Sequence, residues 1–285
     1  MTDRNEDPTL IFLHILKTAG TTLNIILENH YAQERTFATF PNRQHPDGSI
    51  EGFHALSTAA KAEIDLLTGH MGFGLHKYLP RPSVYITILR NPVERVISRY
   101  YHEHRDPNSL LHPAIHDGMD LKGYVKYYAR VAEMDNLQTR MIAGNWEKRG
   151  FGPCTEEMLT TAKQNLQDYF VVVGLTERFD ETYLLLQKTL GWETTLYQKY
   201  NVTKNRPRRE NISEETLQVI REYNHYDIEL YNFACELFET QMKQQGWRFP
   251  LKVKLFQLYN HLYPRYWQLR SFSVRTYLRS HLTNH

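Results

Sequence analysis

The fold is decided by Leu10-Ile11-Phe12-Leu13-His14-Ile15-Leu16-Lys17-Thr18-Ala19-Gly20-Thr21-Thr22. Its apolar start is typical of a buried strand, and the apolar residues that follow have helical spacing, namely Leu23, Ile26 and Leu27. The turn between them carries a lysine, a glycine and three threonine hydroxyls. Amides at a helix N-terminus carry partial positive charge, so we predict an anion-binding strand-loop-helix here.

Further strands alternate with helices along the chain. The clearest strand is Ser83–Leu89, which is rich in β-branched and aromatic residues and precedes an Asn91-Pro92 helix start. Other strands are expected at 65–70 and 169–174, and helices at 57–61, 92–101, 121–133, 136–143, 156–167, 179–190 and 213–245. This alternation predicts a P-loop-like three-layer α/β/α fold with a mostly parallel central sheet and a helical C-terminal region.

Acidic residues are unevenly distributed along the chain. The 285 residues carry a net charge of only +2, but residues 251–285 contain no Asp or Glu. We expect a main domain over 1–250 and a basic, aromatic extension over 251–285 that packs on it. Contact of this tail with an anionic surface is a second possibility.

Targeting signals are not evident from the sequence. No run of 18 apolar residues occurs, the first residues lack the apolar stretch of a signal peptide, and there are only two cysteines. We therefore expect a cytoplasmic protein without a transmembrane segment.

The turn at 14–22 is not a Walker loop, because its lysine precedes a single glycine. Its pattern His-Ile-x-Lys-Thr-x-Gly-Thr-Thr instead resembles the 5′-phosphosulfate loop of carbohydrate sulfotransferases, which use 3′-phosphoadenosine 5′-phosphosulfate (PAPS). The resemblance implies that the 5′-phosphosulfate is cradled by Lys17, Thr18, Ala19, Gly20, Thr21 and Thr22, with Lys17 also stabilising the leaving group.

A second segment, 88–101, resembles the 3′-phosphate segment of the same family. Arg90 and Ser98 occupy the places of the arginine that ends a strand and the serine on the next helix. Weaker similarity at 135–140, 173–180 and 224–227 extends the resemblance over about residues 10–231 and favours the hexuronyl (heparan sulfate) 2-O-sulfotransferase-like branch.

His70 is the candidate general base. It ends a predicted strand before a glycine-rich turn, at the sheet edge where Lys17 and Arg90 also fall. A histidine has a pKa suited to proton abstraction near neutral pH, and Gly69-His70 resembles the glycine-histidine pair of the 2-O enzymes. His14 is a candidate for orienting the loop or, equally, a buried strand histidine. The helix after Arg90 offers alternative bases: His102, Glu103 and His104.

Three positions depart from the family pattern. Leu16 stands where the family has proline, Asn91 where it has aspartate, and Thr68 where the 2-O enzymes have a second histidine. The last departure weakens any expectation of specificity for hexuronic acid.

A basic run at 204–209 includes Lys204 and Arg206. By resemblance to a late loop of the family, these two cations are expected at the 3′-phosphate of the nucleotide. The alternative is an ordinary solvated loop.

Together these patterns predict a PAPS-dependent sulfotransferase that acts on a hydroxyl, most naturally of a carbohydrate, with PAPS as donor, without a metal ion and without a nucleic-acid partner. The acceptor is expected to contact the loops at 40–53 and 106–118. Two other readings are a Mg²⁺-dependent nucleotide phosphotransferase and a catalytically inactive module that binds polyanions.

Overall fold

The computed structural model describes residues 7–41, 46–131, 135–146, 152–193, 195–198 and 212–262. Among these residues five strands form one sheet: β1 (Thr9–Leu13), β2 (Thr36–Ala38), β3 (Leu66–Gly69), β4 (Ser83–Leu89) and β5 (Phe170–Leu175). Their order is β2-β3-β1-β4-β5, and every pair is parallel. The predicted α/β fold is confirmed, with a sheet that is parallel throughout.

The helices and short 3-10 turns fill the connections between strands. They are α1 (Gly20–Leu27), η1 (Gln33–Arg35), α2 (Ile50–Ala55), α3 (Thr58–Ala62), η2 (Leu75–Tyr78), α4 (Pro92–Arg105), α5 (His112–His116), α6 (Leu121–Val131), α7 (Leu137–Ala143), α8 (Glu156–Asp168), η3 (Thr176–Arg178), α9 (Phe179–Leu190), α10 (Glu214–Tyr223) and α11 (His225–Gln244). Residues 249–262 form a further helix.

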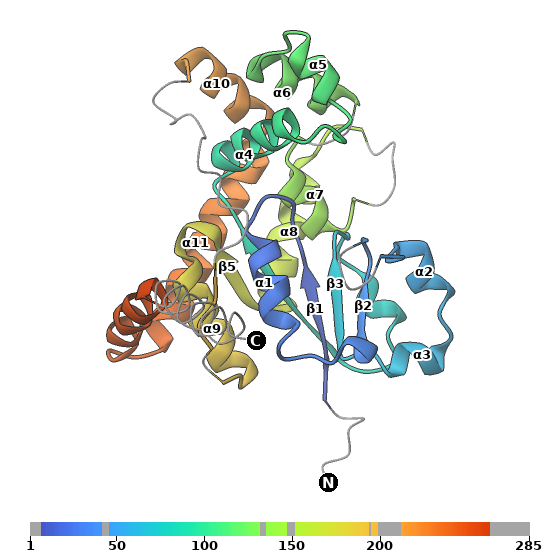
Figure 1. The fold of residues 1–285 in the computed structure, drawn as a ribbon, viewed down its shortest axis with the longest axis vertical. Coiled ribbons are helices and arrows are strands. Elements are labelled where there is room, and N and C mark those ends of the chain that lie inside the picture. Colours follow the sequence, from blue (N-terminus) through green and yellow to red (C-terminus); the bar gives the residue numbers. More distant parts are fainter. Residues whose placement is uncertain are drawn as a thin grey trace, which may run out of the picture.

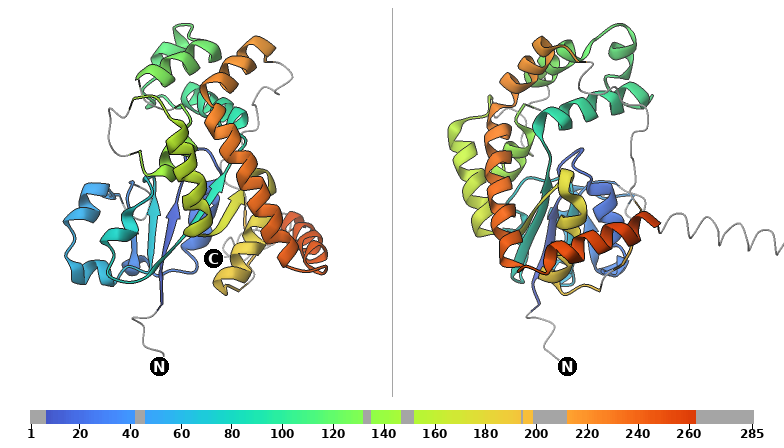
Figure 2. Two further views of the ribbon diagram at one scale, coloured as in Figure 1. Left: turned by 180° about the vertical axis from the view of Figure 1, so that it is seen from behind. Right: turned by 90° about the vertical axis from the view of Figure 1, so that its left-hand side faces the viewer.

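Helices cover both faces of the sheet (Figures 1 and 2). α1 and α9 lie on one face, and α8 and α11 lie on the other. The strands β1 and β3 are buried from end to end, and β4 and β5 are mostly buried, as expected of a sheet covered on both sides. This is the three-layer arrangement that the sequence predicts.

A second group of helices sits above the carboxyl ends of the strands (Figure 1). It consists of α4, α5, α6 and α10, which have a small apolar core of their own, including Ile97, Tyr124 and Ile220. α4 begins as predicted: the Asn91 side chain accepts a hydrogen bond from the amide of Glu94, and Pro92 takes the first helical position. The strand β4 thus leads directly from the sheet into this helical cap.

Several sequence expectations need correction. The long helix expected over 213–245 is broken at Asn224, whose side chain donates to the carbonyl of Ile220 and accepts from buried Arg95. The loop expected over 40–53 gives way to α2 at Ile50. The short strand β2 was not foreseen. In the part of the chain that the structure describes, no helix is long and apolar enough to cross a membrane.

Candidate active site

The loop between β1 and α1 has an unusual backbone. Lys17 and Ala19 both adopt left-handed conformations, with φ of 69° and 65°, although neither is a glycine. Such conformations cost on the order of 1–3 kcal/mol each and persist where the surrounding structure imposes them. Thr18 between them is buried, and its hydroxyl donates to the carbonyl of Ile15 at 2.8 Å. The Thr18 hydroxyl therefore shapes the loop rather than facing a ligand, which leaves its amide for the predicted contact.

Gly20 is required by His14. A Cβ at Gly20 would lie 2.0 Å from Nε2 of His14 and 1.9 Å from its Cδ2, so the imidazole occupies the space that any side chain would need. The helix thus starts over the ring of His14. The family resemblance places Gly20 in the cradle of the 5′-phosphosulfate; in the structure the group that closely approaches Gly20 is the ring of His14.

His14 is oriented by a chain of polar side chains. The Thr68 hydroxyl donates to Oδ1 of Asn24 at 2.7 Å, which directs the Asn24 amide nitrogen toward Nδ1 of His14 at 3.4 Å. With Nδ1 accepting, the proton of neutral His14 lies on Nε2. Burial, together with the nearby charges of His70 and Lys17, lowers the pKa of His14 well below its usual value. His14 is therefore a neutral, fixed ring.

His70 lies directly beside this ring. Leu13 pairs with Gly69 in the parallel register of β1 and β3, so the next residues meet, with ring centroids 4.4 Å apart. Nδ1 of His70 lies 2.7 Å from the carbonyl oxygen of His14, to which only a protonated Nδ1 can donate. Nε2 is consequently the proton-accepting nitrogen. Burial lowers the pKa of His70, although its hydrogen bond to the His14 carbonyl opposes this shift.

Arg90 connects the end of β4 to the loop. Its Nη1 donates to the carbonyl of Lys17 at 3.0 Å. The buried side chain of Gln138 makes two hydrogen bonds to the Arg90 backbone. Its Oε1 accepts from the backbone N–H of Arg90 at 2.9 Å, and its Nε2 donates to the carbonyl of Arg90 at 3.0 Å. Arg90 is thus held from two directions at the carboxyl edge of the sheet.

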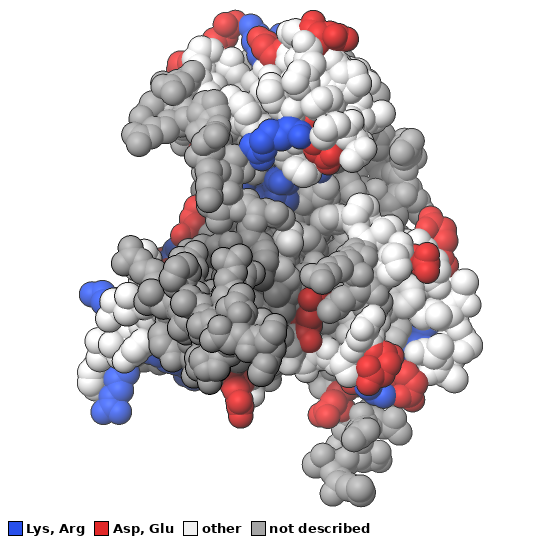
Figure 3. All heavy atoms as spheres, in the orientation of Figure 1, with Lys and Arg blue, Asp and Glu red and all other residues white. Residues whose placement is uncertain are grey.

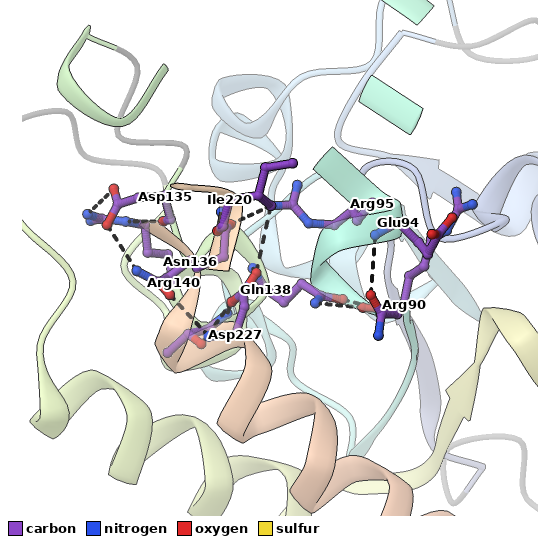
Figure 4. A network of polar contacts seen from close by, with 12 residues as sticks. Arg90, Glu94, Arg95, Asp135, Asn136, Gln138, Arg140, Ile220 and Asp227 are labelled. Atoms are coloured by element: carbon purple, nitrogen blue, oxygen red, sulfur yellow. Dashed lines mark hydrogen bonds and ion pairs between the residues drawn. The ribbon is translucent and has the colours of Figure 1, made fainter. Parts of the chain in front are cut away.

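The position of Gln138 is fixed in turn by a residue of α11 (Figure 4). Asp227 is fully buried and accepts from the amides of Gln138 and Thr139 at the start of α7. It also lies 3.7 Å from Nη2 of buried Arg95 on α4. One carboxylate therefore joins α4, α7 and α11 behind the predicted 3′-phosphate residue.

Cations gather around Lys17. Burial and the nearby guanidinium groups of Arg99, Arg90 and Arg105 lower the pKa of Lys17 to about 8, an effect that Glu103 opposes. Figure 3 shows Lys and Arg side chains on the surface over α4, the helix that carries Arg99 and Arg105. These cations repel one another, so an anionic ligand that binds among them would be favoured.

The residue assignments from the sequence are met to different degrees. Lys17, His70 and Arg90 do meet at the carboxyl edge of the sheet. Ser98 lies half-buried on α4, Thr21 stands exposed on α1, and Thr22 is buried there. Lys204 and Arg206 lie outside the described residues. Among described residues, no group of three or more His, Cys, Asp or Glu side chains is arranged to hold a metal ion.

Other site residues were not singled out in the sequence. They are Asn24, Arg99, Arg105, Gln138 and Asp227, whose roles depend on contacts between distant segments. His102, an alternative base, is close enough to Lys17 and Arg99 for their charges to lower its pKa, although burial contributes most to that shift.

Comparisons with known proteins extend over most of the chain. A family model described as galactose-3-O-sulfotransferase matches residues 2–253. Heparan-sulfate 6-O-sulfotransferase 1 of Cricetulus griseus is 28% identical over 290 residues, which cover 85% of this chain and 71% of that protein. Heparan-sulfate 6-O-sulfotransferase 2 of Homo sapiens is 28% identical over 319 residues, which cover 90% of this chain but only 51% of that protein. The crystal structure of mouse sulfotransferase SULT7A1 complexed with PAP aligns at a TM-score of 0.40 and 15% identity, covering 90% of this chain and 89% of that one.

Proposed function

Since the chain belongs to the galactose-3-O-sulfotransferase family, we propose that it transfers the sulfuryl group of PAPS to a carbohydrate hydroxyl with His70 as the general base. The observation that carries the proposal is the distance of 2.7 Å between Nδ1 of His70 and the carbonyl oxygen of His14. The His14 carbonyl fixes the proton on Nδ1, so Nε2 has a lone pair available at the sheet edge that also carries Lys17 and Arg90.

The proposed step moves one proton and one sulfuryl group. Nε2 of His70 takes the proton of the acceptor hydroxyl as the new bond from oxygen to sulfur forms and the bond from sulfur to the bridging phosphate oxygen breaks. The PAPS donor supplies an activated sulfuryl group, and adenosine 3′,5′-bisphosphate (PAP) leaves. Lys17 faces the negative charge that accumulates on the leaving phosphate, where a preorganised cation stabilises the transition state.

The cationic and hydrogen-bonding residues of the site suit a nucleotide with two anionic ends. Lys17 and the start of α1 form one positive region, and Arg90 with Ser98 on α4 form a second. Arg90 has the planar guanidinium group that pairs well with phosphate, and its backbone is fixed by Gln138. We assign the first region to the 5′-phosphosulfate and the second to the 3′-phosphate.

The acceptor is a carbohydrate in this proposal, and the relatives suggest which ones to test first. The family model and the curated relatives name galactose and heparan sulfate as acceptors, with 3-O and 6-O positions. The narrower hypothesis of a 2-O enzyme gains no support from these relatives. Thr68, in the place of the second histidine of the 2-O enzymes, serves instead to orient Asn24.

The decisive experiment is a transfer assay with radiolabelled PAPS and purified protein. The panel includes galactose-terminated glycans and heparan sulfate, and the labelled position is mapped by NMR. Transfer to a glycan hydroxyl by the wild type, abolished in His70→Ala, is the expected result. Phosphate transfer from Mg²⁺-ATP, with none of sulfate from PAPS, would establish the phosphotransferase instead. PAP binding without any transfer would favour an inactive binding module.

A further inference from the structure

The helix over residues 249–262 has two apolar faces. Phe249, Val253 and Phe256 are buried in the main core, where Phe256 packs beside Tyr183. A second stripe at i, i+4, i+7 and i+11 runs along the opposite side of the helix and is exposed: Leu251, Leu255, Leu258 and Leu262. A helix on the surface of a globular domain ordinarily presents polar residues on that side.

Large apolar residues extend this stripe. Trp247, just before the helix, is 81% exposed, and Tyr259 is 60% exposed. A groove of about 500 Å³ lies between this helix and Leu184 of α9, with Leu251 and Leu255 on its walls. The exposed surface is therefore a continuous apolar face, and not a set of scattered side chains.

The charged residues of this helix, and Arg248 just before it, all have one sign. Arg248, Lys252 and Lys254 flank the leucine stripe and are exposed. Glu239 is the last acidic residue of the chain, so the sequence from 240 to 285 carries only basic charges. The remaining 23 residues of the sequence, 263–285, continue the mixture of arginines with Tyr, Trp and Phe.

This charge pattern selects among possible occupants. A second copy of the chain would bring the same basic residues against each other, which disfavours self-association through this face. An anionic lipid surface offers apolar depth for the leucines, negative charge for the lysines and an interface suited to tryptophan and tyrosine.

We propose that the exposed face of helix 249–262 binds the surface of an anionic lipid bilayer. The helix lies beside α9, at the opposite end of the molecule from α5 and α6 (Figures 1 and 2). A bilayer at this face leaves the helical cap over the candidate active site turned away from the lipid.

The test is co-sedimentation of the full chain with phosphatidylcholine vesicles, with and without phosphatidylserine. We expect binding to the anionic vesicles that weakens as salt is added. The double variant Leu251→Gln/Leu258→Gln should weaken binding about tenfold or more, because two leucines no longer enter the bilayer. Lys252→Gln/Lys254→Gln should also weaken it about tenfold or more, with a smaller salt dependence.

Leu110→Gln is the control, since Leu110 is also an exposed leucine and lies far from this helix, near α5. It should leave vesicle binding unchanged. All the substituted side chains are exposed, so thermal unfolding should stay close to wild type in every variant.

Absence of vesicle binding by the wild type would overturn the proposal, as would equal binding by the leucine variant. A wild-type dimer that the leucine variant dissociates would assign the face to a second copy. Loss of binding to soluble heparin in the lysine variant, with no effect of the leucines on vesicles, would assign it to polyanions.

Discussion

The tautomer of His70 is fixed by the hydrogen bond that its Nδ1 makes. The carbonyl of His14 accepts from Nδ1, and the ring of His14 packs against it. A base held by a backbone carbonyl keeps its tautomer when the acceptor binds, so no rearrangement is needed before proton transfer. The pKa of His70 lies below the usual value of histidine because the ring is buried.

His70→Ala should lower the rate of sulfuryl transfer by roughly 10²–10⁴-fold, the usual worth of a general base. The wild-type rate should rise with pH through a pKa below about 6.5, because only neutral His70 accepts a proton. Steady-state kinetics across pH check both expectations. PAP affinity and thermal unfolding of the variant should match wild type, and His225→Ala, which removes an exposed histidine on α11, serves as control. If the His70→Ala variant is folded, binds PAP and turns over at a near-normal rate, His70 is not the general base, and His102 is the next candidate.

Lys17 makes binding of the nucleotide depend on pH. Its pKa of about 8 reflects burial and three nearby arginines, and a bound phosphate would raise that pKa. Below pH 8 Lys17 is charged in both free and bound protein. Above pH 8 binding must take up a proton, so PAP affinity should fall by up to about tenfold per pH unit.

Calorimetry in two buffers of different ionisation enthalpy measures this proton uptake directly. Lys17→Arg should abolish it, because arginine stays charged throughout this range. Lys17→Ala should lower turnover more than PAP affinity, since a leaving-group cation acts chiefly in the transition state. Affinity that is constant from pH 7 to 10 would contradict the shifted pKa.

At the scale of elements, the site rests on contacts between helices that are far apart in sequence. Asp227 on α11 accepts from two amides of α7 and faces Arg95 of α4, and Gln138 of α7 then holds the backbone of Arg90. Asn136, the residue just before α7, adopts a left-handed conformation, and its side chain does not cap the helix. The Asp227 carboxylate supplies the missing acceptor.

Asp227→Ala should destabilise the protein by about 3–5 kcal/mol, because it leaves the Arg95 charge buried without its carboxylate. Denaturant unfolding measures this change. Asp227→Asn, which keeps an acceptor oxygen, should cost less, and removal of the exposed carboxylate in Asp117→Ala should be nearly neutral. If Asp227→Ala unfolds like Asp117→Ala, the network does not hold the helices together.

Elements were easier to predict than the contacts between them. The strand Ser83–Leu89 and the capped start of α4 follow from local chemistry, namely β-branched residues and an Asn-Pro pair, and both are confirmed. β2 is only three residues long and leaves no periodic signal. The polar contacts from Thr68 through Asn24 to His14 include one between residues 44 positions apart, Thr68 and Asn24, so only the fold reveals them. Arg99 and Arg105 carry no motif in the sequence, and only the fold brings their charges near Lys17.

At the scale of the whole molecule, the candidate site joins two separately packed bodies. Lys17 and α1 belong to the sheet and its main core, whereas Ser98, Arg99 and Arg105 belong to the helical cap with its own apolar core. Arg90 stands where β4 passes from one body into the other. We therefore expect a ligand with two phosphates to reach from the sheet to the cap.

PAP should accordingly stabilise the protein more than AMP, which lacks the 3′-phosphate. A charge-assisted hydrogen bond contributes roughly 1.5–3 kcal/mol, so PAP should bind about tenfold or more tightly. Binding to the folded state alone stabilises it by about 2.7 kcal/mol at a ligand concentration of 100 Kd, which a thermal melt readily detects. Hydrogen exchange in α4 should slow more with PAP than with AMP, because the 3′-phosphate adds a contact to Ser98 of the cap that AMP cannot make. Arg90→Ala should make the two nucleotides equivalent, while Arg221→Ala, which removes a half-buried arginine of α10 bonded to Glu214, should preserve the difference. Equal affinities of PAP and AMP for the wild type would remove the 3′-phosphate from Arg90 and Ser98.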